Sequence, residues 1–181
     1  MKKILFILMV IGIVITNSIN LTYAEEYASE KYNFKIICPE NWAMNSKASS
    51  SKQLFENMAN LSDWVIFIKK TDSELAMLTV YLFEYSKDDP RLGLTLEEQV
   101  KGFIEKENYE IIQPTQQLKI NGKEGLRFIV NSKKNGKVLY SFFRLANDRV
   151  LEMQCAVRPN DNFEQYLPIF EKTIDKIEFN N

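Results

Sequence analysis

The chain has 181 residues, 45% of them hydrophobic, with 23 lysines and arginines against 24 aspartates and glutamates. A chain of this length can bury the core of one ordinary globular domain. Because basic and acidic residues nearly balance, the composition gives no support for electrostatic binding of nucleic acid. The sequence contains no histidine, which excludes Ser-His-Asp and Cys-His nucleophiles, histidine-ligated zinc and an imidazole pH switch.

Residues 1–24 have the pattern of a secretory signal peptide. Lys2 and Lys3 precede an unbroken apolar run at 4–15, and a polar stretch then ends at Ala24. The run is shorter than the roughly 20 residues that a membrane-spanning helix needs. We therefore predict cleavage after Ala24, no stable membrane span afterwards, and an exported protein that is secreted or extracytoplasmic.

The part of the chain after the signal is predicted to begin with a flexible lead-in and a short strand. Residues 25–31 are polar and precede the predicted domain at 32–181. The strand is indicated by alternating inward-facing residues, which are Tyr32, Phe34, Ile36 and Cys38. Pro39 ends this strand. Residues 45–51 are polar and small, which predicts a loop, and apolar spacing allows a short helix at about 52–60.

A hairpin and a helix are predicted next. The segments 64–70 and 75–85 are apolar on both faces and flank the polar residues 71–74, which is typical of two paired strands covered on each side. Thr95 and Glu98 have capping-box spacing, so each can satisfy a backbone N–H of the other. The apolar residues that follow at helical spacing predict an amphipathic helix ending near Asn108.

Four alternating segments between 118 and 157 predict an antiparallel meander. The pairs Asn121-Gly122 and Asn135-Gly136 favour the positive φ angles of type I′ turns, and Asn147-Asp148 is a weaker turn signal. The chain therefore folds back on itself three times in this region.

A last helix is predicted from the apolar stripe between Phe163 and Ile177. Asp161 and Glu164 repeat the capping pattern before it. Pro168 interrupts the stripe, so either the helix kinks at Pro168 or a turn over 161–167 precedes a helix that begins there.

The order of these motifs resembles the Mog1/PsbP-like superfamily. Tyr32-Asn33-Phe34-Lys35-Ile36, followed by Pro39-Glu40-Asn41-Trp42, is similar to the superfamily's opening pattern Y-x-F-x-I-x-x-P-x-x-W. The capping box, the segment 120–125 and the last helix also look like bacterial members, and the resemblance covers residues 32–179. It implies an α+β fold, an α/β/α sandwich around a central antiparallel β-sheet. It also implies binding rather than catalysis, with no common catalytic residues to carry over.

Two cysteines and a few acids are the candidates for chemistry. Cys38 and Cys155 both lie on the inward phase of their strands, so they are either buried free thiols or partners in a disulfide. Without a histidine to activate them, we expect both to be inert. The acids at 88, 89 and 161 lack the spacing of a calcium loop. We therefore predict no metal site and no cofactor.

The aromatic content offers the one candidate binding face. It combines one side of the segment 75–85 with one side of the segment around 140, and its members are Tyr81, Phe83, Tyr85, Tyr140, Phe142 and Arg144. If a helix covers these residues they are core, and if the cover is incomplete they have the composition of a protein-binding surface.

The function predicted from the sequence is an exported, non-enzymatic binding or accessory domain with a protein partner in the envelope or the extracellular space. One alternative is a carrier of a small apolar ligand, which an enclosed pocket lined by Phe and Met would favour. The other is a hydrolase with paired carboxylates in a pocket between residues 43–63 and the sheet, which clustered acids with raised pKa values would favour.

Overall fold

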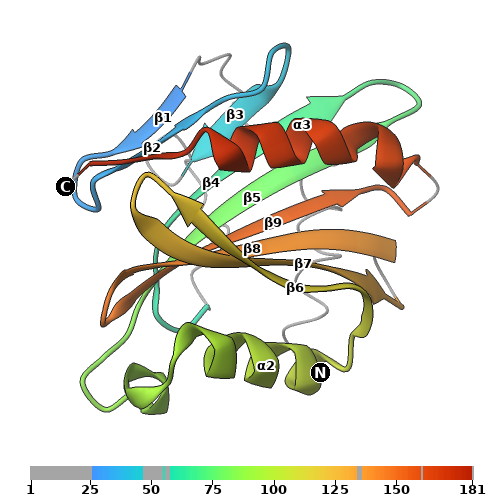
Figure 1. Ribbon diagram of the computed structural model, residues 1–181. Helices are drawn as coiled ribbons and strands as arrows, with labels where there is room; N and C mark the ends of the chain where they lie inside the picture. The colour runs from blue at the N-terminus through green and yellow to red at the C-terminus, as the bar shows by residue number, and fades with distance from the viewer. Residues whose placement is uncertain (1–25, 47–54, 56–57, 134–135, 160, 181) are drawn as a thin grey trace.

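A seven-stranded antiparallel sheet is the frame of the molecule (Figure 1). The structure is a computed structural model that describes residues 26–46, 55, 58–133, 136–159 and 161–180. The strands, in spatial order, are β3 (Ala43–Ser46), β4 (Leu61–Lys70), β5 (Leu75–Glu84), β9 (Arg149–Val157), β8 (Gly136–Ala146), β7 (Lys123–Ser132) and β6 (Glu110–Ile120). Helix α2 (Leu96–Glu107), which follows the short 3-10 helix η1 (Pro90–Gly93), covers one face, and helix α3 (Phe163–Asp175) covers the other. The predicted α/β/α sandwich is confirmed.

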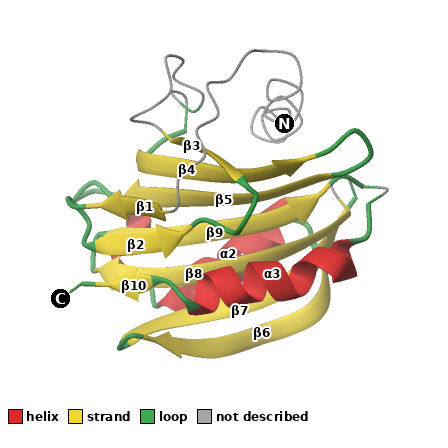
Figure 2. Ribbon diagram, turned by 90° about the horizontal axis from the view of Figure 1, so that it is seen from above, coloured by secondary structure: helices red, strands yellow, loops and turns green. Residues whose placement is uncertain are grey.

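A second, three-stranded sheet lies on the same side as α3 (Figure 2). Its central strand β2 (Phe34–Ile37) pairs with β1 (Glu26–Ser29) on one side and with β10 (Glu178–Phe179) on the other. The Lys35 ammonium lies 3.0 Å from the Glu26 carboxylate and 3.5 Å from that of Glu178. The small sheet thus joins β10, the strand after α3, and β1, the first described strand, through β2, which lies between them.

The prediction of a flexible lead-in over 25–31 is wrong for Glu26–Ser29. The backbone of this segment pairs with β2, and the Tyr27 hydroxyl donates to Asp63 of β4 over 2.6 Å. The predicted loop over 45–51 is likewise wrong for Asn45 and Ser46. Both residues are paired with β4 at the edge of the large sheet, because backbone pairing does not require apolar side chains.

The hairpin β4–β5 and the meander β6–β9 follow the sequence prediction. Asn121 and Gly122 both have positive φ, 47° and 82°, as a type I′ turn requires. Residues of β4 and β5 are buried on both faces of the sheet: Val65 and Phe67 face the α3 side, whereas Trp64 and Ile66 pack with Phe55 on the other. The cover on both sides explains why these strands are apolar throughout.

The two helices begin in different ways. Thr95 and Glu98 form the predicted capping box of α2, and Asn108 ends that helix in a left-handed conformation. At α3 the predicted cap is wrong, because the Asp161 carboxylate accepts a hydrogen bond from the backbone N–H of Leu75 (2.8 Å) and leaves the helix start at Asn162 without a side-chain cap. The helix continues through Pro168, so the alternative that it begins at Pro168 is also wrong.

Several predictions fall outside the described part of the chain. They are the signal peptide at 1–24, residues 47–51 of the predicted loop, most of the short helix at about 52–60, and Asn135 of the Asn135-Gly136 turn. Within the described residues, no helix is long and apolar enough to cross a bilayer.

Candidate functional site

The predicted aromatic face belongs to the core. Tyr140 is 1% exposed and Phe142 is 7% exposed, because Phe103 of α2 packs edge-on against both, with ring centroids 5.1 and 5.5 Å away. The Tyr140 hydroxyl also shares a hydrogen bond with that of Tyr109 (3.1 Å). Burial raises the pKa of Tyr140 well above its usual value. Helix α2 therefore covers Tyr140 and Phe142, so this part of the predicted face is core rather than a protein-binding surface.

The other members of the predicted face are also covered or anchored. Tyr81 is buried against Phe55 in a separate cluster, with ring centroids 5.3 Å apart, and Phe83 is half-buried between that cluster and the one that contains Tyr140. Tyr85 is buried in the cluster of Tyr140 and Phe142, beneath the Arg91 guanidinium, which lies 4.1 Å from its ring centroid. The sixth residue, Arg144, donates to the backbone oxygen of Leu94 at 2.8 Å. The predicted binding patch is thus divided among core clusters and an anchored arginine.

The two cysteines are free and buried. Cys38 Sγ donates to the backbone oxygen of Trp42 over 3.6 Å, and burial raises the pKa of Cys38 to about 11. Cys155 is fully buried in the core, and burial raises its pKa well above the ordinary value. Both groups are therefore protonated at neutral pH, which leaves neither as an activated nucleophile.

Two carboxylates gather where β1 meets the large sheet. Asp63 accepts hydrogen bonds from Tyr27 and Ser29, and Glu84 accepts from Tyr32 (3.0 Å) and Lys31 (3.2 Å). These hydrogen bonds, that from Lys31 foremost, lower the pKa of Glu84. A carboxyl group that acts as a general acid near neutral pH needs a raised pKa instead. The cluster ties β1 and the turn after it to β4 and β5.

No group of three or more cysteine, aspartate or glutamate side chains converges on a metal-binding geometry among the described residues. Asp89 is a candidate cation ligand from the sequence. Its carboxylate accepts hydrogen bonds from the backbone N–H and the guanidinium of Arg91 and caps η1.

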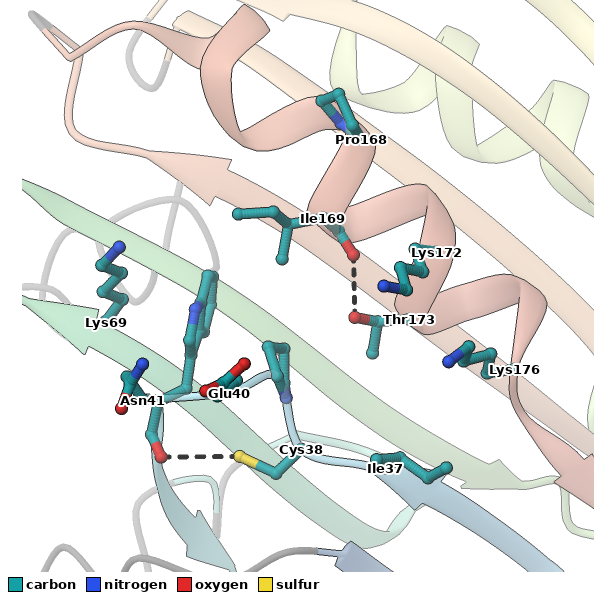
Figure 3. Close-up of a pocket in the computed structure, with 12 residues that line it drawn as sticks. Ile37, Cys38, Glu40, Asn41, Lys69, Pro168, Ile169, Lys172, Thr173 and Lys176 are labelled. Atoms are coloured by element: carbon teal, nitrogen blue, oxygen red, sulfur yellow. Dashed lines mark hydrogen bonds between the residues drawn. The ribbon is translucent and has the colours of Figure 1, made fainter.

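A cleft of about 950 Å³ lies between α3 and the connection from β2 to β3 (Figure 3). Strand β2 contributes Ile37, the connection contributes residues 38–42 and β4 contributes Lys69. Helix α3 contributes residues on the face that looks across the cleft. Ile169, Lys172 and Lys176 follow one another along the α3 wall, and Lys69 lies across from them (Figure 3). The cleft is therefore bordered by apolar groups and by three lysines.

Local contacts hold the connection in place against α3. The backbone N–H of Trp42 donates to the Pro39 oxygen (3.1 Å), and Asn41 adopts a positive φ of 63° that completes the bend. The Trp42 indole packs edge-on against Tyr166 and Phe170 of α3, with ring centroids 6.3 and 6.0 Å apart. The Pro39–Trp42 segment, read from the sequence as a fold motif, thus forms one wall of the cleft.

The charge of the cleft is positive. Lys69, Lys172 and Lys176 line it together with one acid, Glu40. The Lys69 ammonium lies 5.7 Å from the Tyr166 ring centroid, which is within range of a cation–π contact. Among the described residues none of the three lysines forms an ion pair with a carboxylate. Anionic groups are therefore favoured in this cleft.

The cleft differs from the sites that the two alternative functions require. Its lining contains neither phenylalanine nor methionine, so it is not the pocket expected of an apolar-ligand carrier. Its single acid, Glu40, cannot provide the two carboxylates of a glycosidase-like hydrolase. The sequence did not single out this site. The one signal for it was the pair Lys172 and Lys176, one helical turn apart on the polar side of a predicted amphipathic helix.

Comparison with known proteins identifies the fold. No family model matches the chain, and no curated protein matches its sequence. Among solved structures, the solution structure of cyanobacterial PsbP (CyanoP) from Synechocystis sp. PCC 6803 matches with a TM-score of 0.59 at 12% sequence identity. The match covers 91% of this chain and 95% of that chain. The chain therefore has a PsbP-like fold, as its motifs predicted.

Proposed function

We propose that this protein is an exported, non-enzymatic binding domain that engages a protein partner in the cell envelope or outside the cell. The observation that carries the proposal is the cleft between α3 and the β2–β3 connection. It is concave, it combines apolar and cationic groups, and it is assembled from segments far apart in the chain. These are properties of a recognition site.

The chemistry of the described residues supports binding over catalysis. The pKa of Glu84 is lowered rather than raised, and both cysteines have raised pKa values. The resemblance to Mog1/PsbP-like proteins, which share binding rather than a reaction, is consistent with this. The signal-like pattern of residues 1–24 supports export, and the mass of the secreted protein tests it: a chain that begins at Glu25 is expected.

Site-specific photo-cross-linking tests whether the cleft is the binding surface. We place a photoreactive amino acid at Ile37, which lines the cleft and is 41% exposed. The matched control carries it at Leu94, which is 38% exposed and precedes α2 on the opposite face of the sheet. Both proteins are expressed in the native host as full chains and irradiated there.

We expect the photoreactive group at Ile37 to cross-link one partner protein that the group at Leu94 does not cross-link. The purified partner should also bind the purified chain. Equal cross-linking at the two positions, or none at Ile37, would contradict the proposal for this surface. An added small apolar ligand that displaces the cross-linked protein would instead favour the carrier function.

A further inference from the structure

The cleft brings together three lysines that have no carboxylate partner in the part of the chain that the structure describes. Lys31, Lys35, Lys101 and Lys137 each form an ion pair with a carboxylate. Other lysines that pair with no described carboxylate, such as Lys87, Lys106 and Lys119, lie outside the cleft. The three cleft lysines have no such partner among the described residues, although the whole chain has a net charge of −1. Three unpaired ammonium groups around one recess raise the local concentration of anionic ligands.

The cationic groups are spread over the cleft rather than gathered at one point. Lys172 lies on α3 and Lys176, four residues further on, is the residue that ends this helix. Lys69 lies on the wall opposite them (Figure 3). A ligand with a single anionic group can approach only part of this arrangement. A ligand with several anionic groups along its length can pair with all three lysines.

Apolar groups line the cleft beside the lysines. They are the side chains of Ile37, Pro39, Pro168, Ile169 and Trp42, of which Trp42 is 3% exposed. Apolar side chains of a ligand can therefore pack in the cleft next to its charged groups.

We infer that the occupant of the cleft is an extended, acidic segment of a protein partner, in which carboxylates alternate with apolar side chains. The inference rests on the proposed function, because it names the partner chemistry at the same cleft. An extended segment with this alternation directs its carboxylates to one side and its apolar side chains to the other. The carboxylates can therefore face Lys172 and Lys176 while the apolar side chains pack against the opposite wall. The site is recessed, which suits a segment that inserts into it better than the flat surface of a membrane.

The probe is a set of fluorescein-labelled peptides of about eight residues, a length typical of extended-segment recognition. One peptide alternates Glu with Leu, and its matched partners carry Gln or Lys in place of every Glu. Binding to the full chain is measured by fluorescence anisotropy. We expect the Glu peptide to bind at least about tenfold more tightly than the Gln peptide, and its affinity to fall as salt rises.

Two variants change the affinity in opposite directions. Replacing the cleft lysines together (Lys69→Gln, Lys172→Gln, Lys176→Gln) should weaken the Glu peptide about tenfold, and Glu40→Gln should tighten its binding about twofold. The first control (Lys87→Gln, Lys106→Gln, Lys119→Gln) makes the same charge change at exposed lysines outside the cleft. The second, Glu97→Gln, removes an exposed acid on α2. Neither control should change the affinity by more than about twofold.

Equal binding of the Glu and Gln peptides, or equal loss in the cleft and control lysine variants, would overturn the inference. Binding to vesicles of anionic phosphatidylglycerol without binding to the Glu peptide would also overturn it, in favour of a lipid headgroup. Cross-linking of a partner at Ile37 that persists in the cleft-lysine variant would refute only the acidic chemistry. Loss of that cross-link in an Ile169→Asp protein, which keeps the photoreactive group at position 37, would then still support the proposed function.

Discussion

Gly125 allows a quantitative test of the packing between β7 and β8. It lies directly opposite Phe143 in the sheet, and an added Cβ would lie 2.5 Å from Cδ1 of Phe143 and 2.7 Å from the backbone oxygen of Phe142. Carbon contacts are optimal at about 3.5–4.0 Å, so the ring and the strand would both have to move. Phe143 is itself fully buried against Phe179, with ring centroids 5.4 Å apart.

The magnitude follows from two opposing effects. Overpacking of a core costs about 1–3 kcal/mol, whereas replacing glycine by alanine restricts the unfolded chain and offsets about 0.4–1 kcal/mol of that cost. We therefore expect Gly125→Ala to lower the free energy of unfolding by about 1–2 kcal/mol. In a chain of this size the Tm should fall by about 2–8 °C.

Urea titration followed by circular dichroism measures the change. The control is Gly102→Ala, because Gly102 lies exposed in α2 with nothing within 4 Å of the added Cβ. This substitution should raise the free energy of unfolding by about 0.5–1 kcal/mol. Phe143→Leu should also cost less in the Gly125→Ala background than in the wild type. A Gly125→Ala protein as stable as the wild type, or a double-mutant cycle without coupling, would refute the reasoning.

Three further predictions concern the acid range, the thiols and the aromatic core. Hydrogen bonds from Arg91 lower the pKa of Asp89 to about 2, so its stabilising effect is present above the ordinary carboxyl pKa near 4 and is lost as the pH falls through about 2. Asp89→Asn removes the charge that accepts hydrogen bonds from the Arg91 guanidinium. It should lower the free energy of unfolding by about 0.5–2 kcal/mol at neutral pH and reduce its acid dependence, as urea titrations at several pH values will measure. Cys38 and Cys155 should not react with iodoacetamide until the protein is denatured, since both are buried with raised pKa values; rapid alkylation of the native protein, detected by mass spectrometry, would contradict this. Tyr140→Ala should cost about 3–5 kcal/mol of unfolding free energy, whereas Tyr140→Phe should cost only about 0.5–1.5 kcal/mol through the lost hydrogen bond, and a small effect of the alanine variant in thermal unfolding would indicate that this residue is not core.

The elements that could be predicted from the sequence are those whose signals lie close together in the chain. The capping box of α2 depends on two residues three positions apart, and the turn at Asn121-Gly122 depends on the φ angles of two neighbours. Alternation within β7 to β9 likewise reports which residues face inward, because successive side chains of a strand point to opposite sides. These signals were sufficient to predict the elements and their order, since each is decided by local geometry, whereas the sandwich arrangement was implied by the resemblance to the Mog1/PsbP-like superfamily.

What covers each face of the sheet, and where a cleft remains, depends on contacts between residues far apart in the chain. Asp161 looks like a helix cap in sequence, but its carboxylate binds the Leu75 backbone, 86 positions away. Tyr140 and Phe142 could have formed a surface until Phe103 of α2 was placed over them. The cationic cleft arises in the same way, because the β2–β3 connection and α3 meet only through long-range packing. Such contacts depend on how whole elements are arranged in space, which no local pattern of residues encodes.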